Sequence, residues 1–486
     1  VSVEPMDIKA ELEDAVYTYH EFLAAEGIAV YHTDCEEEFG PIPGDPDRLR
    51  QVFCNLLDNA AKHGGSGKRI EASMSYDGKD VIVSQVYGDP TTGKYDDTKT
   101  PVILNIYAAD KALQGAKASG IADALMDSTP MVVIAGQVPS PLLGTDAFQE
   151  VDVIGITQPI TKWAYQIRKP EEIAWAVSRA FYIASTGRPG PVVLDLAKDA
   201  QVGLVDYEYK KVDYVRSYQP EPDIKKDRIK AAADLINEAK KPFCLVGQGV
   251  LLGGAEEELK AFLQKNDIPA GSTVLGLSAL PTDFPLNKGM LGMHGNVGPN
   301  RKTNECDVLI AIGMRFDDRV TGDLNHYAKQ AKIIHLDIDP AELNKNVKAD
   351  APVLGTVKES LPAITALLNP AKHTEWIESF KEHDEREFNK VIEREVYPSS
   401  GEITMGEVIH KISEATNNNA VVVTDVGQNQ MMAARYSGYS QTRSLVTSGG
   451  LGTMGFGLPA AMGAKIGAPD RTVVMYTGDG GFQMTI

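Results

Sequence analysis

The sequence predicts an α/β protein of several domains with doubly wound parallel sheets, preceded by a shorter α+β segment. From about residue 119 onward, short apolar segments rich in valine and isoleucine alternate with amphipathic segments of helical period. This alternation is typical of parallel strands connected by helices that cover both faces of a sheet. Glycine-rich turns follow several of the apolar segments, and 486 residues leave room for about two to four domains.

The composition is that of an ordinary soluble globular protein and disfavours some classes of partner. Hydrophobic residues make up 43% of the chain and charged residues 24%. The net charge of −19 argues against nucleic acid and anionic membranes, because both repel an acidic surface. No apolar run reaches the length of a membrane span. Four cysteines lie far apart without a CxxC pair, which predicts free thiols in a reducing cytoplasm: Cys35, Cys54, Cys244 and Cys306.

Residues 1–88 predict the α+β segment. Apolar residues between Leu12 and Leu23 recur at helical spacing, and IAVYH after them reads as a strand. DRLRQVFCNLLDNAAKHGG carries a broad apolar stripe of helical period, and IEASMSYDGKDVIV predicts two strands joined by a turn at Asp77–Gly78. The segment should therefore contain two helices and a small sheet.

The second of these helices carries a candidate nucleotide site. Asn55 and Asn59 are four residues apart and share one face, with Lys62 just beyond them. Two amides and a lysine on one helical face are able to hold Mg²⁺ and the phosphates of a nucleotide. The alternative is a solvated polar face, which composition alone favours, so both interpretations stay open at this point.

A junction, an α/β segment and a linker follow in residues 89–224. Residues 89–118 are interpreted as an unassigned junction, in which VILNIYA is a short strand and the tail a helix. In residues 119–205, PMVVIAGQV and PGPVVLDLA read as buried strands, and PEEIAWAVSRAFYIAS as an amphipathic helix with acidic residues in its first turn. Polar residues 206–224 predict a linker.

A second α/β unit is expected over residues 225–370. KPFCLVGQGV predicts a strand that ends in a glycine loop with Gly247 and Gly249, and EEELKAFLQKN a helix. KIIHLDIDP predicts a strand that ends in Asp337 and Asp339, where dinucleotide-binding sheets hydrogen-bond a ribose. The two glycines are a weak phosphate signal, because many strand-to-helix turns use glycine for steric reasons. A nucleotide site and a purely structural turn both remain possible.

The last unit is expected over residues 402–486, after a linker at 371–401. VVVTDVGQNQ predicts a strand and a loop, and SGGLGTMGFGLPAAMGAKIGAP a glycine-rich loop that leads into a helix. Its glycines let the backbone approach a ligand closely and leave amide groups free for anions. TVVMYTGDGG then presents Asp479 at a strand end, where a carboxylate suits Mg²⁺ that bridges a diphosphate. The alternative is a tight turn with a surface aspartate.

The first segment resembles the ATP-binding domain of sensor histidine kinases, whose N-box is similar to NLLDNAAKH here. The resemblance implies that Asn59 lies beside Mg²⁺ and that Lys62 contacts phosphate, with Asn55 on the same face. After the second strand, that family has an Asp-x-Gly-x-Gly loop that reads adenine, whereas this chain has SQVYGDP. A phosphoacceptor histidine motif is also missing, so the fragment is expected to be partial and not to use ATP.

Residues from about 119 to 486 resemble the large subunit of acetolactate synthase (acetohydroxyacid synthase). The motifs that carry the resemblance follow the family's order: GIADALMDSTPMVVIAGQVP, GTDAFQEVD, TKW, GRPGPVVLDLAKD, MLGMHG, RFDDRVTG, HLDIDP, DVGQNQM, TSGGLGTMGFGLPAA and GDGG. The resemblance implies an aminopyrimidine-binding domain, of which residues 119–205 are the C-terminal half. It also implies a central FAD-binding domain and a domain for the diphosphate of thiamine diphosphate and Mg²⁺.

The resemblance also implies a reaction and a set of site residues. Pyruvate would be condensed with a second 2-keto acid, a step of branched-chain amino acid biosynthesis. The substrate channel would be bordered by Phe148, Gln149 and Lys198. The thiamine diphosphate site would comprise Gly427, Gln428, Gly449, Gly450, Gly452, Met454, Gly478 and Gly480, with Asp479 on Mg²⁺. The FAD region would comprise Gly247, Gly249, His294, Arg315, Asp318, Arg319, Asp337 and Asp339.

The chain departs from the family pattern at several points. Asn429 stands where many members have histidine, and no glutamate in residues 1–118 has the context of the family's catalytic glutamate. The family also continues beyond GDGG to a further metal ligand. The chain is therefore expected to be truncated at both ends, chimeric and impaired in catalysis. The competing hypothesis is a non-catalytic chimera or a nucleotide-binding signalling protein.

The resemblance has implications for partners and location as well. Members of the family form dimers or larger assemblies, so a homo-oligomer is expected, with a regulatory small subunit as a possible partner. Neither nucleic acid nor a membrane is expected as a partner. The expected location is the cytoplasm.

Overall fold

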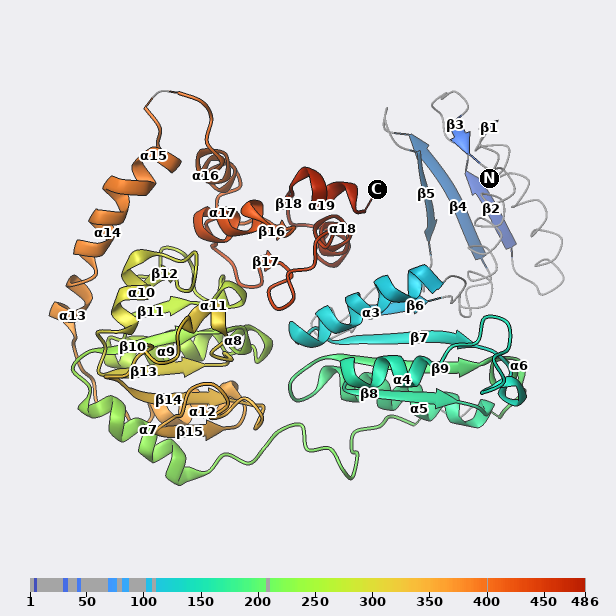
Figure 1. Cartoon of the computed structure of the whole chain (residues 1–486), viewed down its shortest axis with the longest axis horizontal. Coiled ribbons are helices and arrows are strands. Elements are labelled where there is room, and N and C mark those ends of the chain that lie inside the picture. The colour runs from blue at the N-terminus through green and yellow to red at the C-terminus, as the bar shows by residue number, and fades with distance from the viewer. Residues whose placement is uncertain are drawn as a thin grey trace. The chain divides into compact units, whose positions relative to one another are not determined.

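The computed structural model describes residues 4–6, 29–33, 42–44, 69–76, 81–86, 102–106, 111–206, 210–399 and 401–485 (Figure 1). Contacts between residues divide the chain into two units, Val1–Thr98 and Lys99–Ile486. Among the described residues, no helix has both the length and the apolar character that crossing a membrane requires.

The described residues of the first unit form two small sheets. Strand β2 pairs in parallel with β4, and β4 pairs antiparallel with β5, with Tyr76 opposite Val81. Strands β1 and β3 form an antiparallel pair. The bounds are β1 Glu4–Met6, β2 Ala29–Thr33, β3 Ile42–Gly44, β4 Arg69–Tyr76 and β5 Val81–Val86. The strand at IAVYH and the two paired strands at 69–86 are thus confirmed, whereas Asn55, Asn59 and Lys62 lie outside the described residues.

The second unit begins with a four-stranded parallel sheet of order β6-β7-β9-β8. Its strands are β6 Val102–Ile106, β7 Met131–Gln137, β8 Trp163–Ile167 and β9 Pro191–Ala197. Helix α3 (Lys111–Met126) runs without a break across residue 118. Part of the predicted junction therefore belongs to this sheet, because β6 pairs with β7 along five residues.

Helices cover both faces of this sheet, as its apolar strands require. Helix α5 (Pro170–Ser185), predicted from its sequence, buries Ala176, Ala180 and Ile183 against one face. Residues of α3 and the segment around α4 pack on the other face, where Ile121 and Val193 are buried. The short helical segments of this region are η2 Ser140–Leu142, α4 Val153–Thr157, η3 Gln158–Ile160 and α6 Lys198–Val202.

The central sheet has six parallel strands in the order β12-β11-β10-β13-β14-β15. Its strands are β10 Pro242–Val246, β11 Ala270–Ser272, β12 Asn287–Met290, β13 Val308–Ile312, β14 Lys332–Asp337 and β15 Ala351–Leu354. The associated helical segments are α7 Lys226–Glu238, α8 Gln248–Leu252, α9 Glu256–Asn266, η4 Val274–Gly276, α10 Val297–Thr303, α11 Asp318–Thr321 and α12 Val357–Thr365. This architecture confirms the predicted α/β class.

Alternate residues of the central strands serve two separate cores. Cys244 and Val246 face a core that includes Phe262 of α9 and Leu361 of α12. Phe243 and its same-face neighbours instead pack against a second core on the other side of the sheet. The sheet is doubly wound because each strand has a period of two and both faces are buried.

The segment 371–401, predicted as a linker, is largely helical. It contains α13 Thr374–Glu378, α14 Lys381–Glu387, the π-helical turn η5 Phe388–Ile392 and α15 Glu393–Val396. Trp376 and Phe380 belong to the second core of the central sheet, and Trp376 Nε1 donates to Pro242 O at 2.9 Å. The start of this segment is therefore part of the central domain, because its aromatic side chains complete that domain's core.

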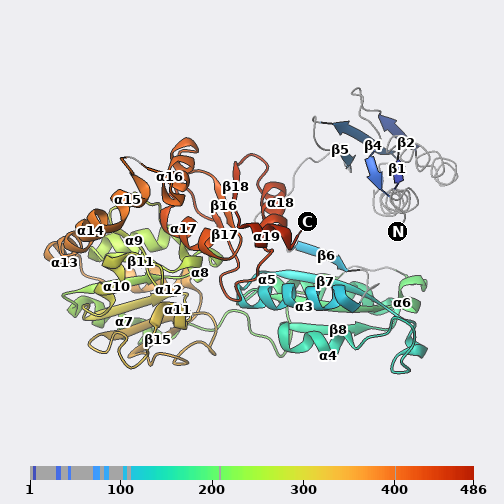
Figure 2. The ribbon, with the colours of Figure 1, turned by 45° about the horizontal axis from the view of Figure 1, so that its top comes forward.

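The last sheet has three parallel strands in the order β17-β16-β18. They are β16 Val421–Thr424, β17 Leu445–Val446 and β18 Val473–Tyr476, and the helices are α16 Met405–Ala415, α17 Gln428–Tyr436, α18 Gly457–Gly467 and α19 Asp479–Gln483. Helix α18 packs against β16 and β18 (Figure 2). Strand β16 is fully buried, whereas all four residues of β18 are only half-buried.

Candidate functional site

The glycine-rich segments of the last domain converge on one buried carboxylate, that of Asp425. Asp425 directly follows β16, and its Oδ1 and Oδ2 accept hydrogen bonds from Gly455 N (3.1 Å) and Gly457 N (2.9 Å). Its own amide donates to Tyr476 O at the end of β18. Because β16, β17 and β18 are parallel, the loops at their carboxyl ends meet at one edge of the sheet.

Glycines are required around Asp425 for steric reasons. A Cβ on Gly481 would lie 2.5 Å from Asp425 Oδ1, and a Cβ on Gly457 would lie 3.0 Å from Asp425 Cβ. Gly452 and Gly455 have φ angles of 67° and 85°, in the left-handed region that favours glycine. The loop and the turn after β18 are therefore held tightly together by one side chain.

The outer side of the same turn is open. A Cβ on Gly478 would meet nothing within 4 Å, and one on Gly480 would meet only Met454 Cε at 3.9 Å. Met454 is 49% exposed, and Asp479 is exposed as the first residue of α19. These residues line open space, which fits a bound diphosphate with a metal ion. Within the described part of the chain, no group of three or more His, Cys, Asp or Glu side chains forms a ready metal site.

The amino end of α17 lies at the same edge of the sheet. Gly427 precedes the helix with φ 134° and ψ −152°, and both Gly427 and Gln428 are exposed. Asn429 is buried, and its Nδ2 donates to Tyr476 O at 2.8 Å, which ties the helix to the end of β18. Three predicted segments, the 427–428 turn, the glycine-rich loop and the Gly478–Gly480 turn, are thus brought together.

Two predicted glycines have a different partner. The amides of Gly449 and Gly450 donate to Asp127 Oδ2 (2.9 Å) and Oδ1 (2.7 Å). Burial raises the pKa of Asp127 to about 6, although the two amide hydrogen bonds oppose this shift. Asp123 accepts from Ser448 Oγ at 2.5 Å beside it. These amides therefore hold a carboxylate of the same chain and are not free for an anion in this structure.

The residues predicted for FAD gather at the carboxyl edge of the central sheet. Gly247 and Gly249 follow β10, His294 follows β12, the Arg315–Arg319 segment follows β13, and Asp337 ends β14. Gly247 and Gly249 donate to Ile312 O and Gly313 O, and side chains there would collide with Gly313. Close backbone packing thus accounts for both glycines, as the steric interpretation expects.

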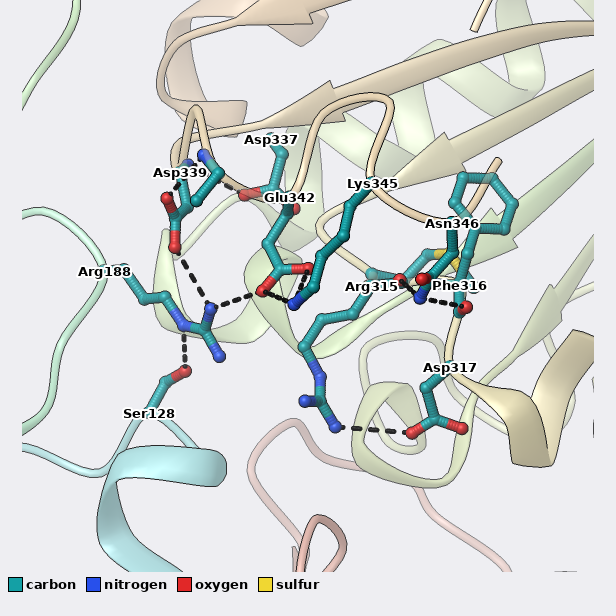
Figure 3. A network of polar contacts seen from close by, with 12 residues as sticks. Ser128, Arg188, Arg315, Phe316, Asp317, Asp337, Asp339, Glu342, Lys345 and Asn346 are labelled. Carbon is teal, nitrogen blue, oxygen red and sulfur yellow. Dashed lines mark hydrogen bonds and ion pairs between the residues drawn. The ribbon is translucent and has the colours of Figure 1, made fainter. Parts of the chain in front are cut away.

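The acidic pair at the end of β14 has two distinct environments (Figure 3). Burial raises the pKa of Asp337 to about 6, and its Oδ1 accepts from Asp339 N at 2.9 Å. Arg188 Nη1 donates to Asp339 Oδ2 at 3.1 Å and to Glu342 Oε1 at 2.9 Å. Arg188 Nε also donates to Ser128 Oγ, so this arginine connects the first sheet domain of the unit with the central domain.

The segments after β12 and β13 enclose a cavity of about 400 Å³. Met293, Asp318 and Arg319 are exposed at this cavity, and Tyr327 lines it with a buried hydroxyl. Within the described residues, the Tyr327 hydroxyl and both ring nitrogens of His294 have no hydrogen-bond partner. Arg315, in contrast, contacts Asp317 at 3.3 Å. Of these unpartnered atoms, the Tyr327 hydroxyl belongs to a residue that lines the cavity, so a polar group of a ligand could bind there.

The predicted substrate-channel residues lie at the carboxyl edge of the first parallel sheet. Phe148 and Gln149 are in the loop after β7, and Lys198 begins α6 directly after β9. Phe148 is 87% exposed, and Gln149 has φ 65°, a backbone strain often found at functional sites. Glu150 braces this loop by accepting from the amides of Gly144, Thr145 and Ala147.

Sequence reasoning missed the residues that organise these sites. Asp425 had a visible signal, since it stands between a buried strand and Gly427 in VVVTDVG. Asp127 and Arg188 had none, because the glycine amides that bind Asp127 and the carboxylates that bind Arg188 are more than 150 residues away in the chain. Local patterns do not report such contacts.

Comparisons with known proteins found two matching family models. Residues 229–364 match the thiamine pyrophosphate enzyme central domain, and residues 425–486 match the thiamine pyrophosphate enzyme C-terminal TPP binding domain. The chain therefore contains two domains of thiamine pyrophosphate enzymes.

The chain is also similar to curated acetolactate synthases. It is 46% identical over 376 residues to the probable acetolactate synthase large subunit of Methanocaldococcus jannaschii, covering 75% of this chain and 63% of that protein. It is 42% identical over 373 residues to the acetolactate synthase large subunit of Haemophilus influenzae (76% and 65%) and 42% over 369 residues to that of Lactococcus lactis (76% and 63%). The chain spans less than two thirds of the length of these relatives.

Proposed function

We propose that residues 119–486 form the cofactor-binding part of an acetolactate synthase large subunit. The reaction is the thiamine-diphosphate-dependent condensation of pyruvate with a second 2-keto acid, in branched-chain amino acid biosynthesis. One observation carries the proposal: the 427–428 turn, the glycine-rich loop and the Gly478–Gly480 turn meet around Asp425. The similarity to named acetolactate synthases over three quarters of the chain supports the choice of reaction.

In this proposal, the last domain holds the diphosphate end of the cofactor. Thiamine diphosphate supplies the electron sink for decarboxylation, and the protein supplies orientation and charge. Gly427, Gln428, Gly478 and Gly480 present backbone to the diphosphate, and Asp479 is a ligand of Mg²⁺. Met454, which is half exposed beside this turn, would support the cofactor. Asp425 does not contact ligand but keeps the two glycine segments at a fixed separation.

The central domain holds FAD in this proposal. The contacts would come from the exposed side chains of Asp318 and Arg319, from Arg315 and from His294, which lies in the loop between β12 and α10. Burial and the charge of Arg435 lower the pKa of the half-buried His294 imidazole, which favours its neutral form. A neutral ring keeps one nitrogen as donor and one as acceptor toward a ligand.

The remaining domain assignments belong to the same proposal. Phe148, Gln149 and Lys198 border the substrate channel, where a lysine ammonium suits a 2-keto acid carboxylate. A homo-oligomer, with a regulatory small subunit as a further partner, and a cytoplasmic location follow from the same resemblance. The similarity of residues 1–88 to histidine kinases stays a prediction.

A binding experiment tests the diphosphate site. Gly478→Ala fits the fold, because its Cβ meets nothing within 4 Å, yet it fills the space proposed for the diphosphate. We expect the variant to bind thiamine diphosphate, titrated calorimetrically with excess Mg²⁺, at least about tenfold more weakly than the unchanged chain. Gly463→Ala in α18, which also meets nothing within 4 Å, is the matched control and should bind normally.

The product formed from pyruvate tests the reaction class. With saturating thiamine diphosphate, Mg²⁺ and FAD, turnover of pyruvate is expected to be slow, because no glutamate in residues 1–118 has the context of the family's catalytic glutamate. The product that does form should be acetolactate, whereas acetaldehyde would indicate a simple decarboxylase. Absence of thiamine diphosphate binding by the unchanged chain, or equal affinities for Gly478→Ala and Gly463→Ala, would refute the proposed site.

A further inference from the structure

A buried ion pair joins three segments that are distant in the sequence. Glu387 is the last residue of α14 and its side chain is 4% exposed, and Arg435 in the last turn of α17 is 17% exposed. Arg435 Nη2 donates to Glu387 Oε1. The third segment is the loop 291–296, called here the His294 loop, which connects β12 with α10.

Both charged groups hold the His294 loop. Glu387 Oε2 accepts from Val297 N at 2.7 Å, and its Oε1 accepts from Asn296 Nδ2 at 3.2 Å. Asn296 Oδ1 in turn accepts from Met290 N at 2.9 Å, so the two ends of the loop are joined. Arg435 Nη1 donates to His294 O at 3.5 Å. The loop is thus fixed at its start, at its end and at His294 itself.

Loss of either Glu387 or Arg435 should destabilise the His294 loop. Removal of one member of a buried pair leaves the other charge uncompensated, which costs far more than an exposed pair contributes. Glu387 accepts hydrogen bonds from three groups, so its loss would leave Val297 N, Asn296 and Arg435 without their acceptor. Glu378 and Lys381, 3.7 Å apart nearby in the chain, form an exposed pair and provide a natural contrast.

We infer that Glu387 and Arg435 are positioning residues, which hold the His294 loop in register with α17 and so couple the proposed flavin site to the proposed diphosphate site. The inference rests on the proposed function for the identity of the two ligands. Its structural basis is that α17 begins at the Gly427–Gln428 turn and carries Arg435 in its last turn. A shift of the loop is therefore transmitted to the helix whose first residues face the other cofactor.

The first test measures FAD affinity of the whole chain by quenching of flavin fluorescence. Glu387→Gln and Arg435→Gln are each expected to weaken FAD binding about tenfold, and the double variant no more than about twofold beyond the worse single variant. Glu378→Gln is the matched control and should bind FAD normally. Circular dichroism establishes that each variant is folded, and Arg435→Gln, at the more exposed partner, carries the test if Glu387→Gln does not fold.

The second test does not depend on any cofactor. Histidine labelled with ¹³C reports the His294 titration in the cofactor-free chain, assigned with a His294→Gln variant. Burial and Arg435 lower the pKa of His294, so release of the loop in Glu387→Gln should raise it, and Glu378→Gln should leave it unchanged. Loss of the Glu387 charge without release of the loop would leave Arg435 uncompensated and lower the pKa of His294 further. An unchanged or lowered His294 pKa in folded Glu387→Gln therefore overturns the inference. If the unchanged chain binds no FAD, the flavin part of the proposed function fails, while the titration still decides the role of Glu387.

Discussion

The central sheet and the C-terminal sheet are both parallel, yet their strands differ in burial. In β14 of the central sheet, five of six residues are buried, and helices cover both faces. In β18 of the C-terminal sheet, all four residues are half-buried, although this strand leads directly into the Gly478–Gly480 turn. We therefore expect the central domain to be the more stable of the two, whereas the Gly478–Gly480 turn, proposed to bind the diphosphate, follows a less buried strand.

The largest expected effect follows from this contrast. Phe243 is fully buried in β10 and packs against Phe380, with ring centroids 5.7 Å apart. Phe243→Ala should lower the free energy of unfolding of the central domain by about 3–5 kcal/mol, because it removes a large buried side chain and leaves a cavity. Val474→Ala in β18 should cost only about 1 kcal/mol.

Trp376 lies in the same core as Phe243 and reports the central domain in a denaturant titration by its fluorescence. Limited proteolysis gives an independent readout, in which a fragment of about residues 225–387 should survive longest. Equal losses for the two variants, or preferential survival of a C-terminal fragment, would contradict the contrast between the sheets.

A smaller effect with a defined pH dependence is expected at Asp337. Burial raises its pKa from 3.8 to about 6, so the folded state binds a proton more tightly than the unfolded state does. Ionisation is thus penalised in the folded protein, and its stability should fall as the pH rises from about 4 to about 6. Asp337→Asn removes this penalty, so its stability relative to the unchanged chain should increase by about 2–3 kcal/mol over that interval.

Asp323 serves as a control, because the relative stability of its Asn variant should change with pH in the opposite direction. The hydrogen bond from Asn325 N lowers the pKa of this exposed carboxylate, so Asp323→Asn should lose relative stability as the pH rises. Urea titrations at several pH values measure both trends. A flat difference between Asp337→Asn and the unchanged chain would show that Asp337 has an ordinary pKa.

The steric role of one glycine is the next test of the C-terminal sheet. Gly481→Ala places a Cβ 2.5 Å from Asp425 Oδ1, so the turn after β18 must shift. We expect a loss of about 1–3 kcal/mol in the stability of this domain, as for other overpacked sites. Gly478→Ala should be nearly neutral in the same denaturant titration, and a similar loss for both variants would remove the special role of Asp425.

The sequence predicted the elements of this fold better than their contacts. Helix α9 matches EEELKAFLQKN and α5 matches PEEIAWAVSRAFYIAS, because apolar period and end signals are local properties. The segment 371–401 was predicted as a linker, since its many charges conceal the contribution of Trp376 and Phe380 to the central core. Charge-rich composition reports an exposed face, but two buried aromatic side chains are enough to attach a helix.

In the candidate site, too, the local motifs could be predicted from the sequence, but the contacts between distant residues could not. Glycine-rich turns after strands identified the Gly478–Gly480 turn, because that signal is contained in a few consecutive residues. The hydrogen bonds from the amides of Gly449 and Gly450 to the Asp127 carboxylate were not predictable, since they depend on how two domains pack. The ion pair of Glu387 and Arg435 was hidden for the same reason.

The smallest expected effect concerns the exposed face of α18. Ile466 is 80% exposed, so Ile466→Lys removes almost no buried apolar surface and should change the free energy of unfolding by less than about 0.5 kcal/mol. Ile364 in α12 is fully buried, and the same change there should unfold the central domain.

The two variants are compared by denaturant titration at low protein concentration, and the titration is repeated at high concentration. A loss above about 1 kcal/mol for Ile466→Lys that appears only at high concentration would mean that a second copy of the chain covers this face. In that case, the C-terminal sheet would gain in the assembly the burial that it lacks in the single chain.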